Sequence, residues 1–245
     1  MQNFDSNGVA VNIASFLGAA TTRILEVGYD NRPATDEEME RMRGHVKDAM
    51  EEGAMGIGSS LIYAPGDYAS TEELIELCKV ASNYGGMYIS HMRNEDSKVM
   101  SALEELIRIS KEADIPAEIY HLKSSRKPNW KKIDDIIKRV EEVRGQGLKI
   151  TADIYTYNAS STGLTGVIPT WVQEGGHKAW IERMKDPKIR PRLLEDIRKE
   201  LSEQPPEGIL MVGFKTSEMS KKYLSKTVAE AAKMRGQSPE EAIVD

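Results

Sequence analysis

The chain has 245 residues, enough for one large α/β domain or for two small ones. Its formal net charge of -6 argues against nucleic acid or an anionic membrane as the main partner, because both require a concentrated positive surface. The single cysteine, Cys78, excludes an internal disulfide framework, and no window of the sequence is long and apolar enough to span a membrane. We therefore expect a soluble, cytoplasmic protein.

Short apolar runs alternate with amphipathic segments along the first part of the chain. They predict strands at 8–18, 54–63, 87–91, 117–123 and 149–157, and helices at 35–53, 70–86, 96–114 and 129–147. Two of these helices begin with the spacing of a capping box, Thr35 with Glu38 and Ser70 with Glu73. Cys78 falls within the second of them and is expected in the core. One apolar stripe of the last helix is expected to pack on a sheet: Ile133, Ile136, Ile137, Val140 and Val143.

The ends of the predicted strands recur about every 30 residues, the length of one βα unit, and such units in series make a parallel sheet. The sheet can be open and doubly wound, or it can curl into a barrel. The nearest match to a dinucleotide-binding turn, GIGSSL at 56–61, lacks the third glycine. The pattern therefore favours an α/β fold that is a partial TIM-like (β/α) barrel.

The pattern is less regular beyond residue 160. We expect a long loop at 160–180, a helix at 187–204, a further strand at 208–214 and two short helices at 226–236 and 238–245. The chain is thus predicted to be a single domain over 1–245, in which 162–208 form a loop and helix insertion over the barrel mouth.

Two histidines, His91 and His121, each close a predicted strand one βα unit apart. Since the carboxyl ends of neighbouring parallel strands meet at one mouth, the two imidazoles are expected within reach of one metal ion, and zinc suits neutral imidazole. The alternative is that each is a hydrogen-bonded residue with no ligand role. No third ligand stands out, because His45 lies in a polar helix and His177 in a predicted loop, where each is expected to be exposed.

Further polar side chains follow the same strand ends. Lys123 lies two residues after His121, so both can face the mouth if the strand stays regular. Lys123 could hold a substrate carboxylate, form a Schiff base or simply be solvated. Tyr155 lies in the next predicted strand and Ser161 in the loop after it, and their hydroxyls are plausible substrate contacts.

The motifs LIYAPGDYASTEEL, YISHMRNE, AEIYHLKSS and DIYTYNASSTGLT resemble the central barrel of the D-aminoacylases, the N-acyl-D-amino-acid deacylases of the amidohydrolase superfamily. The resemblance implies that His91 and His121 bind one or two zinc ions. It also implies that Lys123, Tyr155 and Ser161 hold the carboxylate of an N-acyl-D-amino acid. The implied reaction is hydrolysis of the amide of that substrate.

The chain also departs from the family. It has no His-x-His pair, and Cys78 does not match the family's early cysteine ligand. It has neither the Ser-Asp-Gly sequence around the family's catalytic aspartate nor the flanking β-sandwich domain. We therefore expect an internal piece of a longer deacylase, inactive by itself, that self-associates through its exposed strand edges.

Three alternative functions stay open at this stage. The chain could act on another cyclic or linear amide, as the dihydroorotases and hydantoinases do. It could be a Schiff-base lyase that uses Lys123. It could also be a non-catalytic barrel kept for binding or assembly.

Overall fold

The computed structural model describes residue 6 and residues 8–245, which divide into two compact units, Met1–Ala159 and Ser160–Asp245. None of the helices in this described part has the length and apolar character that a membrane span requires. The single domain predicted over residues 1–245 stays a prediction, as does the placement of 162–208 over the barrel mouth.

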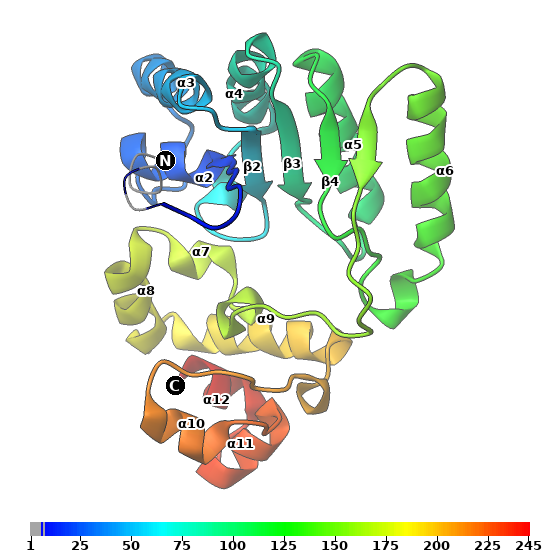
Figure 1. Ribbon diagram of the computed structural model, residues 1–245. Helices are drawn as coiled ribbons and strands as arrows, with labels where there is room; N and C mark the ends of the chain where they lie inside the picture. The colour runs from blue at the N-terminus through cyan, green and yellow to red at the C-terminus, as the bar shows by residue number, and fades with distance from the viewer. Residues whose placement is uncertain (1–5, 7) are drawn as a thin grey trace. The chain divides into compact units, whose positions relative to one another are not determined.

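A parallel sheet of five strands organises the first unit (Figure 1). The strands pair in chain order, and every neighbouring pair is parallel. They are β1 (Leu17–Gly18), β2 (Gly56–Ser60), β3 (Met87–His91), β4 (Ala117–Ile119) and β5 (Ile150–Ala152). Because the order never reverses, the sheet lacks the switch point of a doubly wound fold and has the order of part of a (β/α) barrel. This confirms the predicted fold class.

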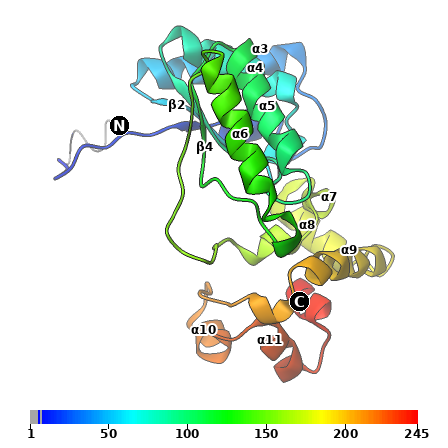
Figure 2. The same cartoon turned by 90° about the vertical axis from the view of Figure 1, so that its right-hand side faces the viewer.

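Helices connect the strands and bury their apolar stripes against the sheet. They are α2 (Ala19–Glu26), α3 (Asp36–Glu51), α4 (Thr71–Asn83), α5 (Val99–Glu112) and α6 (Lys132–Gly145), with short 3-10 turns at Gly66–Tyr68 and Lys127–Asn129. Figure 2 shows α4, α5 and α6 together on one face of the sheet. Ile57 of β2, Tyr88 of β3 and Ile119 of β4 are fully buried beneath them, and Cys78 of α4 lies in the same core, as expected.

Several elements differ from the prediction. The predicted strand at 8–18 is a strand only at Leu17–Gly18, and the strands predicted at 117–123 and 149–157 end after three residues. The short helix α2 was not foreseen, because its threonines favour strands rather than helices. In α6, Ile136 and Val143 are buried but Ile137 is exposed, since it lies at the margin of the stripe that faces the sheet.

The predicted helix starts are largely confirmed. Thr35 accepts a hydrogen bond from the amide of Glu38, and the Glu38 carboxylate accepts one from the amide of Thr35, which completes the capping box of α3. Ser70 caps α4 by accepting from the amide of Glu73. The Glu73 carboxylate does not return to the cap, because it pairs with Arg23 instead.

The second unit is helical. It contains α7 (Thr170–Gln173), α8 (Gly176–Lys185), α9 (Arg190–Glu203), α10 (Ser217–Tyr223), α11 (Val228–Arg235) and α12 (Pro239–Val244), with 3-10 turns at Leu164–Val167 and Pro206–Gly208. Leu193 and Ile197 of α9 pack in one core with Val228 and Ile243. The loop predicted at 160–180 is thus partly helical. The prediction of a strand at 208–214 is wrong. Among the described residues, this segment forms only one isolated antiparallel bridge, between Leu210 and Thr227.

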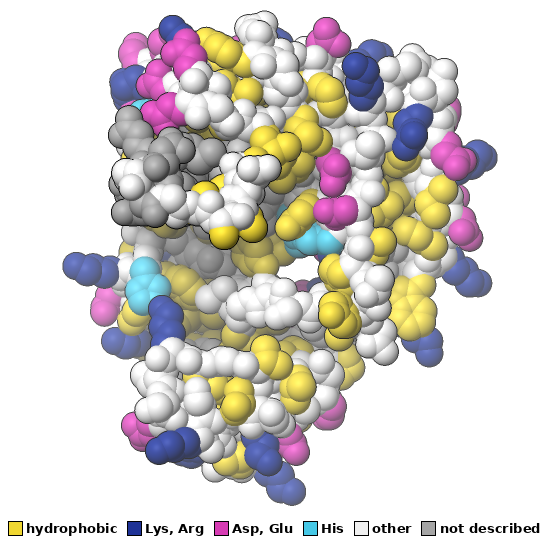
Figure 3. Space-filling model, in the orientation of Figure 1, with side chains coloured by type: hydrophobic (Ala, Val, Ile, Leu, Met, Phe, Trp, Pro, Cys, Tyr) yellow, Lys and Arg dark blue, Asp and Glu magenta, His cyan; other side chains and the backbone are white. Residues whose placement is uncertain are grey.

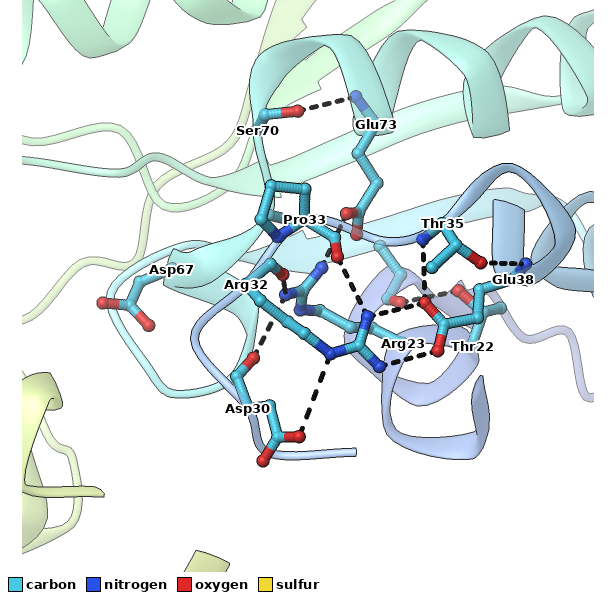
Figure 4. A network of polar contacts seen from close by, with 12 residues as sticks. Thr22, Arg23, Asp30, Arg32, Pro33, Thr35, Glu38, Asp67, Ser70 and Glu73 are labelled. Atoms are coloured by element: carbon cyan, nitrogen blue, oxygen red, sulfur yellow. Dashed lines mark hydrogen bonds and ion pairs between the residues drawn. The ribbon is translucent and has the colours of Figure 1, made fainter. Parts of the chain in front are cut away.

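A buried arginine ties the amino-terminal part of the first unit together (Figure 4). The Arg23 side chain is fully buried and donates to the Glu73 carboxylate at 2.6 Å. It also donates to the backbone carbonyls of Asp30 and Arg32. Arg32 in turn donates two hydrogen bonds of 2.7 Å to Glu38, which lowers the pKa of that carboxyl to about 2. One cation therefore links α2, the loop after it and the start of α4.

Replacing Arg23 by alanine should lower the free energy of unfolding by about 3–5 kcal/mol, because Glu73 would keep a buried charge without its partner. Arg108→Ala removes an exposed arginine that pairs with Glu72 and Glu112 and should cost far less. Urea unfolding followed by circular dichroism measures both. Equal losses in the two variants would show that the buried pair is not a main support of this unit.

Candidate metal centre

His91 and His121 meet at the carboxyl end of the sheet. His91 is the last residue of β3, and His121 lies two residues beyond the end of β4. The Nδ1 atom of His91 and the Nε2 atom of His121 are 2.9 Å apart, and the two rings pack edge to face. On the face of the molecule drawn in Figure 3, histidine side chains (cyan) border hydrophobic ones (yellow). The structure thus brings together the two imidazoles that the strand spacing pairs, while their role as ligands stays a prediction.

A turn, and not a continuing strand, places His121. Its φ of 42° lies in the left-handed region, which is unusual for a residue with a side chain. Asp153 holds this turn, because its carboxylate accepts from the amide of His121 and its carbonyl accepts from the amide of Leu122 at 2.8 Å. Strand alternation therefore does not orient Lys123, contrary to expectation, yet its Nζ atom still lies 2.7 Å from the Nδ1 atom of His121.

Glu95 joins the histidine pair from the loop that follows β3. Its Oε1 atom lies 3.1 Å from the Nδ1 atom of His121, and its Oε2 atom lies 3.6 Å from the Nε2 atom of His91. Among the described residues, His91, Glu95 and His121 form the one group of three metal-ligating side chains close enough to surround an ion. The sequence singled out no third ligand, and the only signal for one was a carboxylate four residues after His91.

The residues expected to hold a substrate carboxylate divide between the two units. The Lys123 ammonium donates to Glu95 at 2.7 Å and lies 5.8 Å from the centre of the Tyr155 ring. Tyr155 also lies 6.4 Å from the His121 ring, so it belongs to the same cluster. Ser161 is an exposed residue of the second unit.

The other two histidines lie elsewhere. His45, on α3, is 2.6 Å from the Glu26 carboxylate, and its side chain is 37% exposed. His177 is exposed on α8 and was expected in a loop. Neither joins the group formed by His91, Glu95 and His121.

The electrostatics favour a neutral histidine beside a partly buried carboxyl. Burial lowers the pKa of His91 to about 3, and electrostatic interactions with His121 and Lys123 add to the shift. Burial raises the pKa of Glu95, and the ion pair with Lys123 opposes that rise. Within the described residues, no group hydrogen-bonds to the buried Nε2 atom of His91. Burial thus favours the neutral form of the His91 imidazole, which is the form that binds a metal.

The distances fit a zinc ion. Tetrahedral zinc binds imidazole nitrogen at about 2.0–2.1 Å, which requires two ligand nitrogens about 3.3 Å apart. The facing nitrogens of His91 and His121 are 2.9 Å apart and need separate only slightly to admit an ion. Two imidazoles with a carboxylate beside them also match the nitrogen and oxygen donors that zinc accepts. The residues present therefore fit the metal.

Arg93 fastens the loop that contains LIYAPGDYAS to the site. It donates to the carbonyls of Asp67 and Ala69, at 2.7 and 2.9 Å, and pairs with Glu105 of α5 at 2.8 Å. The loop follows β2, and its Tyr63 ring lies 6.2 Å from the His91 ring. This motif therefore forms one wall of the histidine site.

The order of the strands is that of part of an amidohydrolase-type (β/α) barrel. No family model matches the sequence. The chain is 39% identical over 155 residues to the D-aminoacylase of Alcaligenes xylosoxydans xylosoxydans, a match that covers 63% of this chain and 32% of that protein. It is therefore homologous to the D-aminoacylases, and it spans about a third of the length of this relative.

Solved structures agree with this assignment. A crystal structure of D-aminoacylase, described as defining a novel subset of amidohydrolases, superposes with a TM-score of 0.76 at 27% identity, over 99% of this chain and 43% of that one. N-acyl-D-glutamate deacylase from Bordetella bronchiseptica, solved with zinc and a phosphonate inhibitor, shares the fold with the same TM-score at 24% identity. This match also covers 99% of the present chain and 43% of the deacylase chain. The five-stranded unit and the helical unit thus each have a counterpart in these enzymes.

The lowered pKa of His91 predicts how stability depends on pH in the metal-free chain. The unfolded imidazole takes up a proton near pH 6.5 and the folded one only near pH 3, so the unfolded state binds more protons between these values. The free energy of unfolding should therefore fall as the pH drops through this window. Between about pH 7 and pH 4, the free energy of unfolding measured with urea should fall less steeply with falling pH in His91→Gln than in the wild type. The difference in slope should correspond to at most about one bound proton. A His91 imidazole that titrates near pH 6.5 by NMR would contradict this.

Proposed function

We propose that this chain carries part of the active centre of a zinc-dependent hydrolase that cleaves the amide of N-acyl-D-amino acids. The observation that carries the proposal is the pair of facing imidazole nitrogens of His91 and His121, 2.9 Å apart at the ends of neighbouring parallel strands. The identity of 39% with a D-aminoacylase supports the substrate class. The proposal concerns the activity of the whole protein, since the chain spans about a third of that relative.

In this proposal His91 and His121 hold the zinc through neutral imidazole nitrogens. The bound ion would supply a polarised carbonyl and a water of lowered pKa. Burial of His91 beside Lys123 keeps its ring in the neutral form that a metal requires. Hydrolysis adds one water across the amide and yields a carboxylate and a free D-amino acid.

Lys123, Tyr155 and Ser161 would bind the substrate carboxylate. The three donors of the Lys123 ammonium contact Glu95, the Nδ1 atom of His121 and the His121 carbonyl, so a substrate carboxylate would replace one of the two contacts with His121. Its contacts with Glu95 and with the His121 carbonyl hold it as a donor, which favours a carboxylate clamp over a Schiff-base nucleophile. The aspartate base that the family resemblance implies is not among these residues, so no proton-transfer step is assigned to this chain.

Zinc binding tests the metal site. The chain should bind zinc in equilibrium dialysis, and His91→Ala or His121→Ala should abolish tight binding, because each removes one of the two nitrogen ligands. His177→Ala removes an exposed histidine of the second unit and should leave binding unchanged. A chain that binds no zinc, or that binds it equally well without His91, would refute the metal site.

Ligand binding tests the substrate class. An N-acetyl-D-amino acid should bind the zinc-loaded chain, and Lys123→Met should weaken binding by about 10–100-fold, the value of a hydrogen bond to a charged group. The corresponding uncharged amide is the matched control, since it lacks the carboxylate and should bind both forms equally. Isothermal titration calorimetry measures the four affinities.

Turnover by the isolated chain should be negligible for the same substrates, because the Ser-Asp-Gly sequence that the resemblance implies around the base does not occur in it. Rapid release of the free amino acid by the purified chain would contradict this assignment.

Self-association of the chain stays a prediction. Light scattering tests it, and a stable monomer would contradict it.

A further inference from the structure

We propose that Arg93 is a positioning residue that holds loop 61–70, the segment between β2 and α4, at the histidine site. The inference rests on the proposed function, since it concerns how that site holds its ligand, and it assigns a role to a residue outside the predicted ligand and substrate-binding sets. Arg93 lies two residues beyond His91, the last residue of β3. Its guanidinium contacts the loop on one side and α5 on the other.

The loop is tied to the end of β3 at two points. At its start, the amide of Leu61 donates to the carbonyl of His91 at 3.2 Å. Near its end, the carbonyls of Asp67 and Ala69 accept from Arg93 at 2.7 and 2.9 Å. The first tie joins two backbones, whereas the second needs a particular side chain. The position of the second half of the loop therefore depends on the guanidinium of Arg93.

Glu105 of α5 fixes the orientation of this guanidinium. Its two carboxylate oxygens accept from Nε and from a terminal nitrogen of Arg93, each at 2.8 Å. The hydroxyl of Thr71, at the start of α4, donates to the same carboxylate at 2.8 Å. A two-pronged pair of this kind sets direction as well as charge, and the planar guanidinium has donors left for the loop carbonyls. In Arg93→Lys an ammonium would keep the charge but could not make all of these contacts at once.

Tyr63 joins the position of the loop to the site. Its ring lies 6.2 Å from the His91 ring, and its carbonyl accepts from the amide of Asp67 at 3.0 Å. The half of the loop that Arg93 holds is thus bonded to the residue that lies beside the histidine pair. Proteins place many of their ligand contacts on loops that a rigid scaffold positions. A looser loop would therefore give the substrate a less ordered wall to bind against.

The positions of the two histidines are set by other contacts. The register of β3 with β4 brings them to one edge of the sheet, and Asp153 holds the turn at His121. Loss of the Arg93 contacts should therefore separate two properties of the site. The zinc affinity should stay, because both imidazoles keep their places, while the affinity for a ligand that binds beside Tyr63 should fall.

The test compares Arg93→Met and Arg93→Lys with the wild-type chain, and Arg139→Met is the matched control. Arg139 of α6 also makes a two-pronged pair with a carboxylate of α5, that of Glu104. Its side chain is 28% exposed against 30% for Arg93, and its acidic partners lie on α5 and α6. Equilibrium dialysis measures the zinc affinity, and calorimetry measures the affinity of the zinc-loaded chain for an N-acetyl-D-amino acid. Amide hydrogen exchange, followed by mass spectrometry, measures the order of loop 61–70.

In both Arg93 variants we expect exchange in the peptide that covers loop 61–70 to be about 10-fold faster, because hydrogen bonds from a charged group to two loop carbonyls are lost. The ligand should bind about 3–10-fold more weakly, since binding must then order the side chains of the loop. The zinc affinity should not change. Arg139→Met should match the wild type in all three measurements.

Wild-type exchange in the loop of Arg93→Met would overturn the proposal. Equal acceleration in every peptide, or a zinc affinity that falls as much as the ligand affinity, would also overturn it, because either would show a general loss of structure. Wild-type loop exchange and ligand affinity in Arg93→Lys would show that charge alone suffices and that the fork has no such role.

Two points keep this test separate from other failures. If Arg93→Met does not fold, Arg93→Lys still gives the comparison, since it keeps a cation beside Glu105. If the wild-type chain binds no zinc or no N-acetyl-D-amino acid, the proposed function fails, and exchange in loop 61–70 of the metal-free chain still decides the role of Arg93.

Discussion

Parallel pairing of β3 with β4 is the constraint on which the candidate site depends. Tyr88 lies opposite Ala117 and Ser90 opposite Ile119, so the two strands end at the same edge of the sheet. A shift of this register by one residue would turn every side chain of the strand to the other face. The strand order, continuous from β1 to β5, keeps all the connecting loops at this edge available to one site. Register and order together bring His91 and His121 to one place.

The fold could be predicted from the sequence where the signal is local and periodic. The run that ends in His91 is a strand of the predicted length, and α3, α4, α5 and α6 fall within their predicted ranges. Local patterns failed where tertiary contacts decide the conformation. His121 occupies a turn because Asp153, more than thirty residues later, accepts from its backbone amide. The segment at 208–214 has strand composition but forms only one bridge, so it does not become a strand.

The site was predictable in part for the same reason. A histidine at the end of each of two successive βα units can be found by counting residues, because the fold converts that interval into proximity. Glu95 could not be found in this way, since the loop that holds it is shaped by Asn94 and by the bond to Ser125. The buried pair of Arg23 and Glu73 joins residues 50 positions apart and has no periodic signature at all.

The metal-free cluster also explains how an ion could enter at small cost. The contact between His91 and His121 satisfies one polar atom of each ring, and Lys123 balances the charge of Glu95. Binding an ion between the rings would replace that single hydrogen bond, whose net worth is about 1 kcal/mol. Glu95 already compensates the charge of Lys123, so a cation between the rings would meet a nearly neutral cluster. The Glu95 carboxylate lies beside the His121 ring of this cluster. Burial keeps His91 in the neutral form meanwhile, so that no imidazolium charge on this ring opposes the incoming ion.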